Sequence, residues 1–230
     1  MSKPLSGVRI LDFSTLLPGP LCTQHLADLG ADVLKIENCH GGDAARANPE
    51  GGLSMLFLLA NRNKRSLAVD LRQPEGVALV HALVKEADVL VEGFRPGVMA
   101  RLSMDYATLS TLNPKLVYVS ITGYGQTGPY AAKGGHDLNY QSLAGILEQS
   151  GTAEGAPAPG NFQIADLAGG TLSAALGLMA ALFDAQRSGH GRHVDVAMTD
   201  CALAHLIMPL AATESYGAGR PLPRGDDYTS

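Results

Sequence analysis

Two ionisable side chains each follow an irregular segment and stand at the start of a predicted helix. His136 lies in the segment 134–140, and Asp166 lies in the segment 161–170. The first turn of a helix presents backbone N–H groups without partners in the helix and the positive end of the helix dipole. A carboxylate in that position is expected to stay ionised. The sequence therefore predicts two candidate bases that flank one substrate carbon, next to a thioester carbonyl.

This chemistry sets further requirements and leaves alternatives open. Proton removal beside a thioester needs a base within about 3 Å and a donor to the enolate oxygen. We expect a backbone N–H at the start of the Asp166 helix to be that donor. Attack of Asp166 on the thioester, which gives a mixed anhydride, would need that residue alone. Structurally, Asp166 can instead cap its helix, His136 can be a loop histidine bonded to a carbonyl group, and Asp137 is interpreted mainly as a capping residue.

Composition limits the class of protein. The chain has 230 residues, of which 46% are hydrophobic and 17% charged, so we expect a soluble globular protein with one good core. The net charge of −5 argues against a general nucleic-acid binder. Cys22, Cys39 and Cys201 show no metal-ligand spacing, which favours reduced thiols in the cytoplasm and no metal site. We expect no signal peptide, and the longest apolar stretch, 174–183, is too short to span a membrane.

The hydrophobic pattern alternates between strands and helices. Strands are predicted at 8–13, 31–37, 66–70, 88–92, 115–121 and 193–198, and helices at 18–29, 74–86, 96–102, 106–112, 138–151, 167–187 and 200–213. Strand–helix–strand units of this length predict a doubly wound, Rossmann-like α/β fold, with a parallel sheet, helices on both faces and ligands at the strand carboxyl ends. The helix 167–187 is apolar almost all round, so we expect it to be central. Neither a G-x-G-x-x-G fingerprint nor a P-loop is present, so no nicotinamide cofactor is predicted.

Several polar features remain outside these elements. The segment 122–135 has five glycines and no periodicity, and it is either a functional loop or a surface connection. Arg62, Lys64 and Arg65 form either a solvated basic turn or a cluster for phosphate groups. Arg95 follows a strand end, where ligands bind in such sheets, and is predicted to contact a nucleotide.

Taken in order, the motifs resemble those of family III CoA-transferases (the CaiB/BaiF type) and of their relatives, the α-methylacyl-CoA racemases. The matching segments are GVRILDF (7–13), LGADVLKIE (29–37), GGD (41–43), NKRSL (63–67), VEGFRPG (91–97), GYGQTGPY (123–130) and GRHVDV (191–196). The resemblance implies an acyl-CoA substrate, no resident cofactor and an interlocked homodimer. It also implies that 1–215 is a CoA-binding large domain, the N-terminal portion of the family fold. The segment 216–230 would then begin a linker toward a second domain that this chain lacks.

The resemblance also assigns residues. Asp166 aligns with the aspartate that transferases use as a nucleophile and racemases use as a base. His136 matches the racemase histidine, which transferases generally lack. Besides the cations Arg62, Lys64, Arg65 and Arg95, the expected substrate and CoA contacts are Gly123, Tyr124 and Tyr140.

The sequence therefore predicts an isomerase of fatty acid metabolism that interconverts (R)- and (S)-2-methylacyl-CoA thioesters through an enolate. Two alternatives stay open. One is CoA transfer between carboxylic acids through an aspartyl mixed anhydride. The other is a truncated CoA-binding fragment without turnover. No nucleic-acid or membrane partner is expected.

Overall fold

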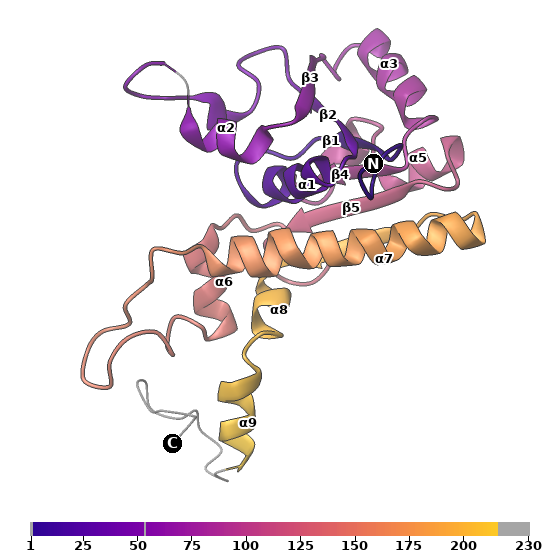
Figure 1. Cartoon of the computed structure of the whole chain (residues 1–230). Coiled ribbons are helices and arrows are strands. Elements are labelled where there is room, and N and C mark those ends of the chain that lie inside the picture. Colours follow the sequence, from indigo (N-terminus) through magenta and orange to yellow (C-terminus); the bar gives the residue numbers. More distant parts are fainter. Residues whose placement is uncertain (1, 53, 216–230) are drawn as a thin grey trace.

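A six-stranded, fully parallel sheet is the framework of the protein (Figure 1). The computed structural model describes residues 2–52 and 54–215. The strands are β1 (Arg9–Asp12), β2 (Asp32–Glu37), β3 (Lys64–Ala68), β4 (Val89–Glu92), β5 (Val117–Thr122) and β6 (His193–Ala197). Their order in the sheet is β3-β2-β1-β4-β5-β6. The predicted doubly wound α/β fold is confirmed, and β3 begins two residues before its predicted start.

Helices cover both faces of this sheet, and each face has its own core. α1 (Pro18–Asp28) and α7 (Ser173–Ser188) pack against one face, whereas α3 (Pro74–Val84), α4 (Val98–Arg101) and α5 (Tyr106–Leu112) pack against the other (Figure 1). Successive strand residues point to opposite faces. Along β5, Val117 and Val119 join the α1/α7 core, and Tyr118 between them joins the α3/α5 core. Burial on both faces explains why the strands read as continuous apolar runs.

The sheet reverses its winding between β1 and β4. The chain leaves β1 toward α1 on one face and leaves β4 toward α4 on the other. The two loops separate at this point and open a crevice at the carboxyl ends of the strands, where open α/β sheets bind ligands.

Two of the later predicted helices have different bounds. α6 covers Asp137–Ala144 and stops well short of residue 151, because Gly145 ends it with a left-handed φ of +83°. The predicted helix 200–213 is two helices, α8 (Met198–Leu203) and α9 (Ile207–Ser215).

Two further helical elements were absent from the sequence prediction. They are a 3₁₀ turn at Ala44–Arg46 and α2 at Met55–Asn61. Ser54 caps α2 by accepting the Phe57 N–H, which is a local signal that the sequence did contain. The predicted linker 216–230 lies outside the described residues.

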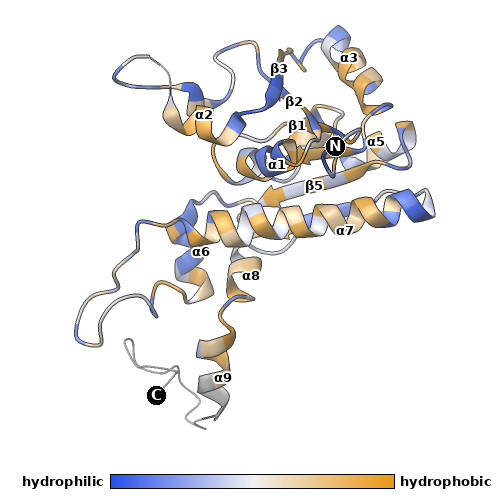
Figure 2. Cartoon of the chain, in the orientation of Figure 1, coloured by the Kyte–Doolittle hydropathy of each residue, from blue (hydrophilic) through white to orange (hydrophobic). Residues whose placement is uncertain are grey.

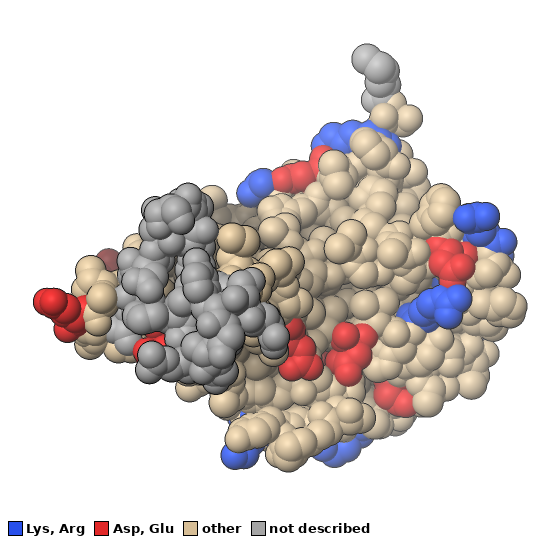
Figure 3. Space-filling model, turned by 90° about the horizontal axis from the view of Figure 1, so that it is seen from below, with Lys and Arg blue, Asp and Glu red and all other residues tan. Residues whose placement is uncertain are grey.

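The apolar helix 167–187 is not central, contrary to expectation. A π-helical turn, Ala165–Leu172, leads into α7, and together they cover one face of the sheet with one side turned outward. That side exposes large apolar groups: Leu172 is 56%, Leu176 is 74% and Phe183 is 61% accessible. Figure 2 shows the mixed hydropathy of α7, and Figure 3 shows wide uncharged areas on the molecule seen from below.

The same helix bears on the membrane prediction. Among the described residues, the continuous stretch Ala165–Ser188 has 24 residues, and 18 consecutive residues within it have a mean hydropathy of 1.5, which suffices by length and composition to cross a bilayer. It is therefore longer than the expected apolar run 174–183. Core helices of globular proteins pass the same test, and this one packs against the sheet.

Candidate active site

Two cavities lie at the carboxyl ends of the strands. The larger cavity has a volume of about 720 Å³ and lies over the β1, β4 and β5 ends. The smaller cavity has a volume of about 400 Å³ and lies over the β1, β2 and β3 ends. Ser14, Thr15 and Phe94 line both of them. The cavities are thus neighbours that share one wall.

The larger cavity brings together most of the predicted site. Five predicted residues from four separate segments line it, namely Arg95, Gly123, His136, Tyr140 and Asp166. The ring of the sixth, Tyr124, packs edge-on against Tyr140 with centroids 5.3 Å apart. The irregular segment 122–135 is therefore part of the cavity wall.

The two tyrosine rings need glycines beside them. A Cβ on Gly123 would collide with the Tyr140 ring, and a Cβ on Gly135 would lie 2.7 Å from that ring and 3.0 Å from the Tyr124 hydroxyl. The Tyr140 hydroxyl also donates a hydrogen bond to the Gly135 carbonyl. These contacts fix the backbone just before His136, which is the N-cap residue of α6.

Asp137, and not Asp166, caps the helix that carries Asp166. Asp137 Oδ1 accepts the backbone N–H groups of Ala165 (2.8 Å) and Asp166 (3.0 Å). Its other oxygen accepts a hydrogen bond from the Gln141 amide. Asp137 is a capping residue, as expected, but it caps a helix 28 residues further along the chain. The donor to the enolate oxygen was expected among the N–H groups at this helix start, but those of Ala165 and Asp166 already have a partner.

The pKa of Asp166 shifts upward, although a carboxylate at a helix start is usually stabilised in its ionised form. Burial, followed by the neighbouring Asp137 charge, raises the pKa of Asp166 to about 6, and the His136 charge opposes this rise. Among the described residues, no hydrogen bond to its carboxylate is found, and the N–H groups of Ala165 and Asp166 bind Asp137 instead. A carboxylate with this pKa can take and return a proton near neutral pH.

Cationic groups stand on the same wall. Arg95 and Lys133 both line the larger cavity. A Cβ on Gly134 would lie 2.5 Å from Arg95 Nη2, so the glycine leaves room for the guanidinium. Lys133 was missed by the sequence analysis, although its place in the glycine-rich segment was a usable signal.

The structure does not bring Arg62, Lys64 and Arg65 to either cavity. Arg62 pairs with Asp28, at the end of α1, and Arg65 pairs with Asp32 (2.7 Å), at the start of β2. Lys64 is buried and pairs with Asp12 at 2.9 Å. All three charges have carboxylate partners, so the geometry does not support their expected role as phosphate contacts.

The smaller cavity was not predicted. Its apolar wall is formed by Ile36, Val69, Leu71, Phe94 and Leu102, and Asn38 and Arg72 also line it. Ligands bind at the carboxyl ends of strands in such sheets, and this rule also applies to the loops that line the smaller cavity. The sequence analysis used the rule only for Arg95. Among the described residues, no group of His, Cys, Asp and Glu side chains is arranged to hold a metal ion.

The sequences of known proteins match almost the whole of this chain. The family model described as CoA-transferase family III matches residues 5–228. The succinate–glutarate CoA-transferase of Agrobacterium fabrum is 43% identical over 88% of this chain and 53% of its own length. The human α-methylacyl-CoA racemase is 41% identical over 85% of this chain and 48% of its own.

A solved structure has the same fold. The crystal structure of a CAIB/BAIF family protein from Brucella suis superposes with a TM-score of 0.92 at 35% identity, covering 99% of this chain and 61% of the other. This chain therefore spans about half the length of the curated relatives it matches.

Proposed function

This chain belongs to CoA-transferase family III, and from that premise we propose that its protein interconverts the (R) and (S) forms of 2-methylacyl-CoA thioesters. The observation that carries the proposal is that His136 and Asp166 line one cavity. Epimerisation needs two groups that exchange protons with the two faces of the α-carbon. His136 supplies an imidazole, and Asp166 supplies a carboxylate whose pKa is about 6.

The proposed reaction is a pair of proton transfers. One of the two bases removes the α-proton, and the electron pair moves toward the thioester oxygen to give an enolate. The conjugate acid of the other base then protonates the α-carbon on the opposite face. The bases exchange roles for the opposite enantiomer, so no proton is gained or lost overall. Since Asp137 occupies the Asp166 N–H, the enolate oxygen needs a different donor.

The two cavities suggest how CoA lies. We place the acyl thioester in the larger cavity and the adenine in the apolar smaller cavity, with the pantetheine arm crossing at their shared wall. Arg95 and Lys133, which line the larger cavity, would take phosphate charge.

CoA transfer between carboxylic acids is the second candidate. The similarity to a succinate–glutarate CoA-transferase favours it, as does the position of Asp166 on the larger cavity. In this case the Asp166 carboxylate attacks the thioester carbon and CoA leaves as the thiolate, giving a mixed anhydride.

An isotope experiment separates the two candidates. The complete protein is incubated with a 2-methylacyl-CoA in deuterated water without a carboxylic acid acceptor. A racemase incorporates deuterium at the α-carbon and inverts it. Absence of deuterium exchange at the α-carbon would rule out the racemase. Transfer of CoA that depends on an added carboxylic acid, together with an Asp166 adduct that hydroxylamine traps, would establish the transferase.

The 230-residue chain alone is the third candidate, as a CoA-binding fragment without turnover. Leu203, Ile207 and Leu210 are exposed on α8 and α9, and such apolar groups favour self-association. For the isolated chain we expect CoA binding in calorimetry, oligomers in sedimentation and no α-proton exchange. Full turnover by the monomeric chain would refute this candidate. The complete protein is proposed to be a homodimer.

A further inference from the structure

One short segment separates the two cavities: residues 14–18, which follow β1 and end at the first residue of α1, here called the dividing loop. Ser14 and Thr15 line both cavities, and the rest of the loop lines the larger one. The Pro18 carbonyl accepts a hydrogen bond from Thr171 Oγ1 at 2.8 Å, within the π-helical turn that carries Asp166. The dividing loop thus touches both halves of the proposed substrate site and the element that carries a proposed base.

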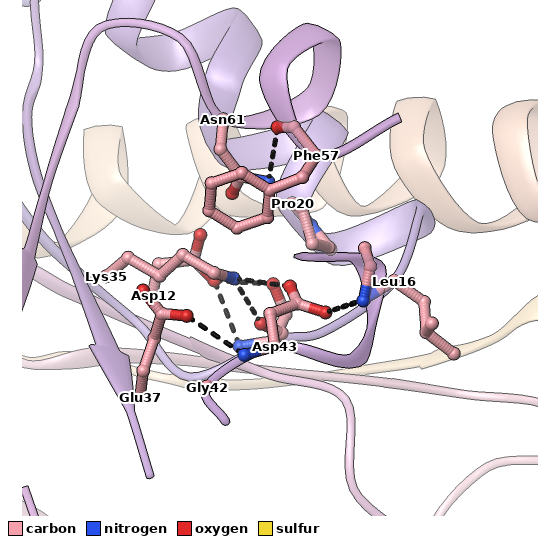
Figure 4. Close-up of polar contacts among 12 residues, drawn as sticks. Asp12, Leu16, Pro20, Lys35, Glu37, Gly42, Asp43, Phe57 and Asn61 are labelled. Carbon is pink, nitrogen blue, oxygen red and sulfur yellow. Dashed lines mark hydrogen bonds and ion pairs between the residues drawn. The ribbon is translucent and has the colours of Figure 1, made fainter. Parts of the chain in front are cut away.

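Buried charged side chains hold the backbone of the dividing loop (Figure 4). Asp12 Oδ1 accepts the Ser14 N–H at 3.0 Å, and Lys35 Nζ donates to the Ser14 carbonyl at 2.7 Å. Asp43 Oδ1 accepts the Leu16 N–H at 3.0 Å. Lys35 Nζ also pairs with Asp43 Oδ2 at 3.0 Å, and these two side chains are only 1% and 0% exposed. Three hydrogen bonds therefore hold the loop backbone at Ser14 and Leu16.

A second buried pair joins the residues on either side of the loop. Lys64 pairs with Asp12 at 2.9 Å and donates to the Pro20 carbonyl (2.7 Å) and to Asn61 Oδ1 (2.8 Å). Burial disfavours the Asp12 charge, but Lys64 and Lys35 outweigh it and hold the pKa of Asp12 below its ordinary value. The NKRSL motif thereby supplies a buried cation that links Asp12, before the loop, to Pro20, after it.

The dividing loop has a conformation that needs such support. Leu16 has a φ of +65°, in the left-handed region that residues with a Cβ rarely adopt. Strain of this kind persists only where surrounding contacts impose it. The bond from the Leu16 N–H to Asp43 acts on the strained residue itself. A buried ion pair adds little to stability compared with apolar side chains of the same size, so a gain in stability is a weak reason for its presence.

The backbone conformation before Asp43 fixes the position of its side chain. Its N–H donates to Glu37 Oε2 at 2.9 Å, and Gly42 before it has a φ of +69°. This accounts for the GGD motif at 41–43, which the proton-transfer chemistry does not use.

We propose that Lys35 and Asp43 are positioning residues: they hold the dividing loop in the one conformation that lets an acyl-CoA span both cavities. The inference rests on the proposed function, because it needs CoA to lie across the shared wall. In this proposal, Lys35 and Asp43 do not contact the reacting atoms.

The CoA affinity of the complete protein tests the positioning role of Asp43, with two replacements whose side chains have nearly equal size. Asp43→Asn and Asp43→Leu both remove the charge opposite Lys35, but only asparagine keeps an oxygen that can accept the Leu16 N–H. In calorimetry, we expect CoA to bind the leucine variant weaker than the asparagine variant by roughly tenfold or more. Adding Leu16→Gly removes the conformational penalty at residue 16, so this difference should fall to about threefold or less.

Leu16→Pro covers the case in which the Asp43 variants do not fold. It leaves the ion pair intact, removes the N–H and forces φ to about −65°. Circular dichroism should show a folded protein whose CoA affinity is reduced by roughly tenfold or more. Equal affinities of the two Asp43 variants, a difference that Leu16→Gly leaves unchanged, or a folded Leu16→Pro variant with wild-type affinity would each overturn the inference.

The proposed function fails separately. A wild-type protein that binds CoA but shows neither α-proton exchange nor CoA transfer refutes the proposed reaction, and the affinity series still decides on the dividing loop. A wild-type protein that does not bind CoA refutes both.

Discussion

Asp137 Oδ1 accepts the backbone N–H of Asp166 at 3.0 Å, so one carboxylate holds the helix start from which the other extends into the larger cavity. The arrangement has two consequences. The start of α6 and the Asp166 helix are locked together, and the Asp137 charge helps to raise the pKa of Asp166.

Asp137→Ala should lower the free energy of unfolding by about 2–4 kcal/mol, because it leaves the N–H groups of Ala165 and Asp166 unpaired. Asp137→Asn is the matched control, since it keeps the accepting oxygen, and should cost about 1 kcal/mol. Urea denaturation measures both. Equal losses would show that the two N–H groups do not depend on Asp137.

Activity should depend on an ionisation near pH 6. Asp166 has a pKa of about 6 and acts as a base only when deprotonated, so turnover should fall as the pH drops through that value. In Asp137→Asn the like charge is gone, so the midpoint should move to lower pH. A pH profile of kcat/KM with the midpoint unmoved in this variant would contradict the assignment.

Removing either base should separate exchange from inversion. His136→Gln and Asp166→Asn each leave one base, so each should still exchange the α-proton of one enantiomer in deuterated water, and the two variants should choose opposite enantiomers. Racemisation should drop on the order of a hundredfold or more in both. Chiral analysis of the deuterated product provides the measurement. If His136→Gln keeps most turnover, the transferase mechanism is favoured.

Arg95→Ala should weaken CoA binding by roughly tenfold or more, since it removes a cation proposed to bind phosphate. Gly134→Ala should act in the same direction but less, because its Cβ would lie 2.5 Å from Arg95 Nη2 and displace that group. Gly160→Ala, where the nearest atom is 4.0 Å away, is the control and should bind CoA like the wild type. Calorimetry measures the CoA affinity of each variant. If Arg95→Ala binds CoA as tightly as the wild type, Arg95 does not contact CoA.

Glu92 should make the protein less stable as the pH rises from 5 to 8. Burial, with a smaller effect of the Asp195 charge, raises its pKa from 4.5 to about 7, although hydrogen bonds from Ser120 and the Phe94 N–H oppose the rise. A raised pKa stabilises the folded state below the unfolded value of 4.5, and this contribution is lost as the pH rises through 7. Glu92→Gln should therefore flatten stability between pH 5 and 8, where the wild type loses up to about 3 kcal/mol. Thermal unfolding at several pH values tests it.

The sequence by itself determined the sheet and the identity of the two candidate bases. Apolar runs such as the one at β5 are buried on both faces, and their alternation with helices leaves a parallel, doubly wound sheet as the consistent arrangement. His136 and Asp166 follow irregular segments at helix starts, which is a local pattern, and the fold brings both to one cavity.

Only the tertiary structure decided which groups these residues meet. The helix-start N–H groups near Asp166 bind Asp137 from 28 or 29 positions away, and burial, followed by the Asp137 charge, raises the pKa of Asp166. Lys64 lies in a basic run typical of a solvated turn, yet it pairs with Asp12 across 52 positions. Local patterns report backbone conformation and amphipathicity. Partners distant in sequence, and the burial that sets a pKa, exist only once the sheet and helices have packed.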